Sequence, residues 1–235
     1  MSRISMTPIA INHRDMDMLL ADTYAKQNGT FKGCSVGCFL HDIYPAKTAY
    51  EIGDLDGKHK IIADHFGYPE WLVLLQDNIF EGLPETDRGN WHVNLAKSID
   101  ALASEPNWQV ILHKVHVALL KVSYANAGQS QNVVQSVIDL HERAASGEVV
   151  SEELWSAAYF SADYDADYAA RSAARSAAWS AARSAADYAA YQDMRDGVLS
   201  AYSAARSAAW SAAYSAAYQD MRDGVLSALD SEKSA

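Results

Sequence analysis

The sequence predicts an all-α protein built in two parts. Apolar residues recur at helical spacing along nearly all of the 235 residues, and no alternating apolar and polar run is long enough for a sheet. The two short strand candidates, WQVIL and VVQSV, each lie inside a longer helical pattern. The last third repeats a four-residue unit rich in alanine, the strongest helix former. We therefore expect a helical domain over 1–150, followed by alanine-rich helices over 151–235 that pack as hairpins or as a bundle.

Glycines and prolines mark where the helices of the first part begin and end. The segment 29–58 contains five glycines and one proline, which predicts loops or short irregular pieces. A strongly apolar helix is expected to begin at Pro69. Its buried stripe is predicted to comprise Trp71, Leu72, Leu75, Ile79 and Phe80. The other helices of this part are expected over 14–28, 58–66, about 88–103, from 108 onward, and over 130–146.

The alanine-rich part places a large residue at every fourth position from Trp155 to Arg195. Four residues turn a helix by about 400°, so each large side chain falls about 40° beyond the last, and the small residues between them allow close packing on several sides. The stretch YQDMRDGVLSA occurs at 191–201 and again at 218–228, a duplication with an offset of 27 residues. We expect Gly197 and Gly224 to break the helices there.

Charge and composition exclude several classes of protein. The net charge of −11 argues against binding to a nucleic-acid backbone, and no apolar run is long enough for a membrane span. The first residues lack the apolar stretch of a signal peptide, and the two cysteines form no disulfide framework. We therefore expect a protein of the reducing cytoplasm. Helix faces of small residues suit self-association and packing within one chain equally well. A homo-oligomer is therefore possible.

The segment GCSVGCFLHD holds the clearest candidate for chemistry. Cys34, Cys38 and His41 could bind zinc if a fourth ligand came from His59 or His65. One alternative is a pair of reduced, partly buried thiols beside a tight glycine turn, and another is a reactive thiol. Without such a metal, no cofactor is expected.

The same segment could instead bind a small anion. Backbone N–H groups around Gly33 and Gly37 could surround an anion at the start of a helix, together with Arg171, Arg175 and Arg183 of the repeat. The alternative is that these glycines only make turns. His113 and His116 lie three residues apart on one helix, a spacing that suits paired ligands but also suits histidines at the edge of an apolar stripe.

The chain also resembles a known group of sequences. GCSVGCFLH, the motif YPEWLVLLQDNIFEGLP and the alanine-rich tail are similar to a group of uncharacterised proteins from bacteria and their phages. The matching residues of the middle motif are Pro69, Trp71, Leu72, Leu75, Asp77, Ile79, Phe80, Glu81, Gly82, Leu83 and Pro84. The tail is also similar in composition to putative immunity proteins of bacterial conflict systems.

These observations favour a protein that is not an enzyme. No Ser-His-Asp context, HExxH or nucleotide fingerprint is present, whereas Trp, Tyr and Arg of the repeat are favoured at binding hot spots. The first hypothesis is stoichiometric binding to a protein partner in host–phage or toxin–immunity conflict. The second is sequestration of a small anionic ligand such as a nucleotide signal. The third is the metal or reactive-thiol site at Cys34, Cys38 and His41.

Overall fold

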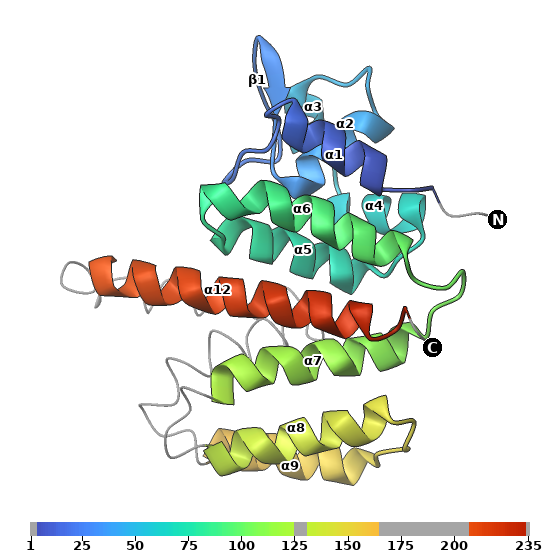
Figure 1. The fold of residues 1–235 in the computed structure, drawn as a ribbon, viewed down its shortest axis with the longest axis vertical. Coiled ribbons are helices and arrows are strands. Elements are labelled where there is room, and N and C mark those ends of the chain that lie inside the picture. Colours follow the sequence, from blue (N-terminus) through green and yellow to red (C-terminus); the bar gives the residue numbers. More distant parts are fainter. Residues whose placement is uncertain (1–3, 125–130, 165–206, 234–235) are drawn as a thin grey trace. The chain divides into compact units, whose positions relative to one another are not determined.

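The computed structural model describes residues 4–124, 131–164 and 207–233. Within these ranges the chain forms ten helices and a single two-stranded hairpin, which confirms the all-α prediction (Figure 1). No helix in the described ranges is both long and apolar enough to cross a membrane. The chain divides into two compact units, 1–106 with 229–235, and 107–228. The boundary predicted at residue 150 falls inside the second unit.

Helix α2 lies at the centre of the first unit, where every residue from Ser35 to Leu40 is buried. It packs against α4 and α5, while α1 packs along α6 (Figure 1). The elements of this unit are α1 (Thr7–Asp15), β1 (Lys26–Asn28), β2 (Thr30–Lys32), α2 (Ser35–Ile43), α3 (Ala49–Gly53), α4 (Lys58–Phe66), α5 (Glu70–Gly82) and α6 (Glu85–Asp100). The unit ends with residues 229–235, where Asp230 Oδ1 accepts a hydrogen bond from Ser98 Oγ at 2.9 Å.

The helix predicted over 14–28 is wrong. Helix α1 ends at Asp15, and the following residues make turns at 16–17 and 21–22 and bond to Gly33 and Cys34, just before α2. Asp17 and Asp22 adopt left-handed backbone conformations, with φ of 52° and 61°, which a helix cannot contain. Leu20 N–H donates to the carbonyl of Gly33 at 2.8 Å. These distant backbone bonds replace the helical ones.

The segment 29–58 is also more ordered than the sequence predicts. It contains β2, α2 and α3 and not only loops. Helix α3 begins with a capping box, in which Thr48 Oγ1 accepts from Glu51 N–H at 3.2 Å and Glu51 Oε2 accepts from Thr48 N–H at 2.8 Å. The side chain of Cys34 caps α2 by accepting from Gly37 N–H at 3.5 Å. These local caps explain why such short helices form.

The apolar helix after Pro69 is confirmed as α5. Leu72, Leu75, Ile79 and Phe80 of the predicted stripe are between 0% and 4% exposed, whereas Trp71 is only half-buried. Each fully buried apolar side chain of this kind contributes about 1.5–3 kcal/mol. The stripe therefore fixes α5 against α2, and with it the polar residues that α5 carries.

The second unit consists of α7 (Trp108–Tyr124), α8 (Gln131–Ala145), α9 (Glu152–Tyr164) and most of α12 (Ser207–Asp230). Helix α7 packs on α8, and α8 packs on α9 (Figure 1). WQVIL and VVQSV both lie in helices, as predicted.

Helix α12 corrects the expectation that Gly224 is a break. The helix runs straight through Gly224, where a Cβ atom would lie 2.9 Å from Cβ of Ala118 on α7. The glycine therefore permits a close helix contact and does not end a helix. Met221, Val225 and Ala228 are buried on the same helix. Gly197, the first copy of the duplicated stretch and the repeat from residue 165 to residue 206 lie outside the described residues.

Candidate functional site

The first unit brings a thiol and two carboxylates together beside the start of α2. Cys34 precedes α2, whereas Asp77 and Glu81 lie one turn apart on α5. The Sγ atom and one carboxylate oxygen from each acid all lie within 4.8 Å of one another. Cys34 is 1% exposed and Asp77 is 9% exposed. We call this set the acidic cluster.

Two further side chains contact the acidic cluster through one oxygen of Asp77. Oδ2 of Asp77 accepts a hydrogen bond from the Tyr24 hydroxyl at 3.3 Å and lies 3.1 Å from Nε2 of His59 on α4. Glu81 Oε2 accepts from the backbone N–H of Asp22 at 2.6 Å. The other oxygen of Asp77, Oδ1, is buried and has no hydrogen-bond partner. Buried carboxylate oxygens are rarely left unpaired, so this atom needs an explanation.

Burial and nearby negative charge disfavour the anionic forms of Cys34 and Glu81 in the absence of a cation. Burial, followed by the charge of Asp77, raises the pKa of the Cys34 thiol well above its ordinary value. Burial also raises the pKa of Glu81 and that of the Tyr24 hydroxyl. A thiol with a raised pKa and almost no exposure is a poor nucleophile, so the geometry gives no support to the reactive-thiol hypothesis.

The glycines of the segment serve close packing. A Cβ atom on Gly37 would lie 1.6 Å from the carbonyl oxygen of Tyr24, and one on Gly33 would lie 2.3 Å from the same atom. Their N–H groups are also occupied, because Gly33 N donates to the Met18 carbonyl and Gly37 N to Cys34 Sγ. These amides are therefore not free to surround an anion, and the glycines instead hold the Tyr24 backbone against α2.

The structure does not bring Cys38 and His41 to Cys34. The thiol of Cys38 donates to the carbonyls of Gly33 and Met18, and burial raises its pKa to about 12. His41 stacks on Phe31 with ring centroids 4.0 Å apart. Both cysteines are free and buried. Of the two candidates for a fourth ligand, His59 reaches the cluster through Asp77, whereas His65 packs against Phe66. Arg171, Arg175 and Arg183 lie outside the described residues.

A second polar feature, which we call the buried relay, begins at the residue after Cys34. His13 Nε2 lies 2.6 Å from Asp42 Oδ2, His13 Nδ1 lies 3.0 Å from His92 Nε2, and His92 Nδ1 lies 2.8 Å from Ser35 Oγ. His13, His92 and Ser35 are each 0% exposed. The relay joins α1, α2 and α6, three helices that are far apart in the sequence.

The relay continues from Ser35 into α5. Gln76 Nε2 donates to Ser35 Oγ at 2.5 Å, and the Tyr68 hydroxyl donates to Gln76 Oε1 at 2.9 Å. With these donors fixed, every link is satisfied by an arrangement of protons in which each hydrogen bond points towards Asp42. In this arrangement Ser35 donates to His92, whose ring is neutral. Burial, and then the neighbouring His13, lower the pKa of His92 well below its ordinary value, which agrees with a neutral ring.

The relay contains the groups of a serine nucleophile, but its burial argues for a structural role. Ser35 contacts His92, His92 contacts His13, and His13 contacts Asp42, so a serine is linked to a carboxylate through two histidines. A substrate carbonyl would have to reach Ser35 Oγ, and Ser35 is 0% exposed. We therefore interpret the relay as a fully paired polar network that fixes how the helices pack.

The neutral histidines predict a loss of stability in acid. An unfolded histidine takes up a proton near pH 6.5, whereas folded His92 does so only at much lower pH, so the unfolded state binds more protons. Each such group lowers the free energy of unfolding by up to about 1.4 kcal/mol per pH unit below 6.5. Burial also lowers the pKa of His116 to about 4 and that of His141 to about 3, so both add to the loss of stability in acid. The raised pKa of Glu81 has the opposite effect on stability and offsets part of the contribution of one histidine. Urea unfolding at several pH values between about 7.5 and 5 measures how the free energy of unfolding depends on pH. A free energy of unfolding that does not change over this range would contradict the prediction.

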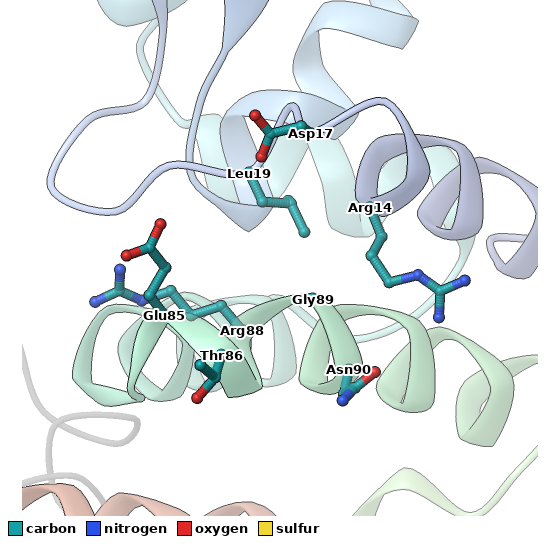
Figure 2. A pocket seen from close by; sticks show the side chains of 8 residues that line it. All are labelled: Arg14, Asp17, Leu19, Glu85, Thr86, Arg88, Gly89 and Asn90. Carbon is teal, nitrogen blue, oxygen red and sulfur yellow. The ribbon is translucent and has the colours of Figure 1, made fainter.

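A small pocket lies between α1 and α6 in this unit. Figure 2 shows Arg14 on one side and Arg88 on the other, with Gly89 between them. Its volume of about 210 Å³ is below the range of about 300–1,000 Å³ that is usual for ligand pockets. Asp17 and Glu85 also line it, so it offers an anion no consistent positive charge.

Comparisons with known proteins leave the site to be interpreted from its own geometry. No family model, no curated protein and no solved structure matches the chain. The resemblance to bacterial and phage proteins therefore stays a prediction.

One sequence pattern points to the acidic cluster, although it belongs to no known metal-binding motif. Asp77 and Glu81 are two acids at a spacing of four on a helix with a strongly apolar stripe, and this spacing places both on one face. Acids on the buried face of a helix are expensive unless they have a partner. The relay histidines offered no comparable signal, because their partners come from distant segments.

Proposed function

We propose that the first unit binds one divalent transition-metal ion of the zinc class at the acidic cluster. The observation that carries this proposal is the buried Oδ1 of Asp77, which has no hydrogen-bond partner beside a thiol and a second carboxylate. Cysteine sulfur, carboxylate oxygen and histidine nitrogen are the donors that zinc takes in proteins.

The dimensions of the cluster fit such an ion after small movements. Zinc lies about 2.0–2.3 Å from its ligands, so the donor atoms of a tetrahedral site are about 3.3–3.8 Å apart. The donors of Cys34, Asp77 and Glu81 lie within 4.8 Å of one another, so they need to close by about 1 Å. His59, whose Nε2 lies 3.1 Å from Asp77 Oδ2, could become a fourth ligand, but it lies outside the set of mutually close donors and would have to move further than they do. Tyr24 would then hold the coordinating carboxylate from outside.

Charge also favours a cation at this place. The cluster gathers three groups that become anionic, and each raises the cost of ionising the next. A divalent ion reverses this effect, since it stabilises the thiolate and the carboxylates together. Metal binding therefore releases the proton of Cys34, and the affinity should rise with pH.

A closed site of four protein donors is typical of a structural ion. That the protein is not an enzyme stays a prediction. Stoichiometric binding to a partner in host–phage or toxin–immunity conflict remains compatible with this role and stays a prediction. Sequestration of a small anion also stays a prediction, although neither the glycine amides nor the pocket of Figure 2 supports it.

The two cysteines provide a matched test of the acidic cluster. We expect Cys34→Ala to bind one zinc ion fewer per chain than the wild-type protein, and Cys38→Ala to bind the same number. Elemental analysis of the folded proteins after removal of excess zinc measures this. Cobalt should give a thiolate charge-transfer band in the wild type and in Cys38→Ala only. Asp77→Asn keeps the side-chain volume and should also lose the ion. Equal zinc content in wild type, Cys34→Ala and Asp77→Asn would overturn the proposal.

A further inference from the structure

We propose that the second unit carries a separate metal site, in which His113, His116 and His141 bind one divalent transition-metal ion through three imidazole nitrogens. The site lies between α7 and α8, and none of its ligands belongs to the first unit. Its donor set, three nitrogens and no thiolate, also separates it chemically from the acidic cluster.

The helix hairpin is what brings the three rings together. His113 and His116 lie one turn apart on α7 and therefore share a face, and α8 returns along α7 so that His141 meets them. Nδ1 of His113 lies 2.9 Å from Nδ1 of His141, and the ring centroids of His116 and His141 are 4.7 Å apart. One nitrogen from each ring lies within 4.8 Å of the others. Donors on one zinc ion would be about 3.3 Å apart.

His116 distinguishes a ligand site from ordinary histidine packing. His113 and His141 can share one proton between their Nδ1 atoms, which accounts for that pair without a metal. His116 is 9% exposed, and both of its ring nitrogens are buried without a hydrogen-bond partner. The T-shaped contact with the ring of His141, at an interplanar angle of 69°, gives neither nitrogen a hydrogen bond. A metal ion provides a partner for one of them at the point where the other two rings converge.

The surroundings keep the rings in the form that binds metals. Burial lowers the pKa of all three histidines, so they are neutral at pH 7 and their lone pairs are available. Trp155, the first large residue of the alanine-rich part, lies against the cluster with its ring 4.7 Å from His141 and 6.0 Å from His113. The indole thus covers one side of the site.

Three imidazoles leave a fourth position open on a tetrahedral ion. Zinc sites with three protein ligands take a water molecule or a small anion in that position. Imidazole donors also suit nickel and copper, whereas calcium and magnesium require oxygen donors that this cluster lacks. The site should therefore take zinc-class ions and reject magnesium.

Zinc titration of the full chain tests this site, with His116→Leu as the diagnostic variant. Leucine has nearly the volume of histidine and removes two unpaired buried nitrogens, so the metal-free variant should stay folded with an unchanged or higher Tm. Its affinity for zinc at this site should fall more than about 100-fold, since even outer partners of a ligand contribute 10–100-fold. The exposed His65 on α4 provides the control, because His65→Gln should bind zinc as the wild type does.

The outcomes separate this site from the acidic cluster. Cys34→Ala should keep the zinc ion that His116→Leu loses, and cobalt at the histidine site should give no thiolate band. The proposal fails if His116→Leu binds as many zinc ions, with the same affinity, as the wild-type protein. It also fails if Cys34→Ala alone removes all bound zinc, since the second unit would then hold none.

Discussion

Replacing Gly37 by alanine is expected to destabilise the first unit by about 3 kcal/mol or more, and so to remove much of its stability. The new Cβ would lie 1.6 Å from the Tyr24 carbonyl oxygen, far inside any permitted contact. The backbone there cannot move away freely, because Cys34 N–H donates to the Thr23 carbonyl at 2.7 Å and Leu20 N–H to the Gly33 carbonyl at 2.8 Å. Relief of the clash would break these bonds. Urea unfolding followed by circular dichroism measures the loss.

Gly53 is the matched control for this substitution. It ends α3 with an ordinary backbone conformation, and a Cβ atom there would meet nothing within 4 Å. Gly53→Ala should therefore change the free energy of unfolding by less than about 1 kcal/mol, and in the stabilising direction, because alanine restricts the unfolded chain. If Gly37→Ala proved as harmless as Gly53→Ala, the close approach of Tyr24 to α2 would be wrong, and with it the placement of Tyr24 beside Asp77.

Replacing His92 by phenylalanine is expected to cost about 4 kcal/mol through the buried relay. Phenylalanine fills the space of the imidazole, so the loss does not come from a cavity. It leaves Nδ1 of His13 and the hydroxyl of Ser35 without their partners in a fully buried core, and each unpaired group costs about 1–3 kcal/mol. Chemical denaturation at pH 7.5 measures the change in the free energy of unfolding.

The same replacement at an exposed histidine shows whether burial of the partners is the cause. His65 is exposed on α4, so His65→Phe should change stability by no more than about 0.5 kcal/mol. Loss of less than about 1 kcal/mol in His92→Phe would show that the relay contributes little, and that apolar packing around Phe39 and Trp91 fixes these helices without it.

Local sequence signals predicted the helices wherever local energetics decide the conformation. The apolar stripe of α5 and its start after Pro69 needed only neighbours along one helix. The stretch after Asp15 has an equally helical pattern, yet its backbone bonds go to Gly33, which no local rule foresees. Gly224 is similar, because its role depends on Ala118, a residue more than a hundred positions away.

The candidate sites show the same difference between contacts within one helix, which the sequence predicts, and contacts between distant segments, which it does not. Cys34 stood out in the sequence as a soft ligand, but its true neighbours Asp77 and Glu81 come from a different helix. Spacing along the chain favoured Cys38 and His41, although the turn of α2 directs them elsewhere. The sequence spacing of three already placed His113 and His116 about one helical turn apart. His141 joins them only because α7 and α8 pack together as a hairpin.

The contact between Gly224 and Ala118 has a consequence for how the length of this protein can change. Residues 191–201 and 218–228 are identical, so each copy offers the same glycine at the same place in the same eleven-residue stretch. Deletion of 27 residues, the offset between the two copies, would therefore still leave one eleven-residue stretch with this glycine. Tandem gain or loss of such a copy would therefore keep a glycine available for the close contact with Ala118.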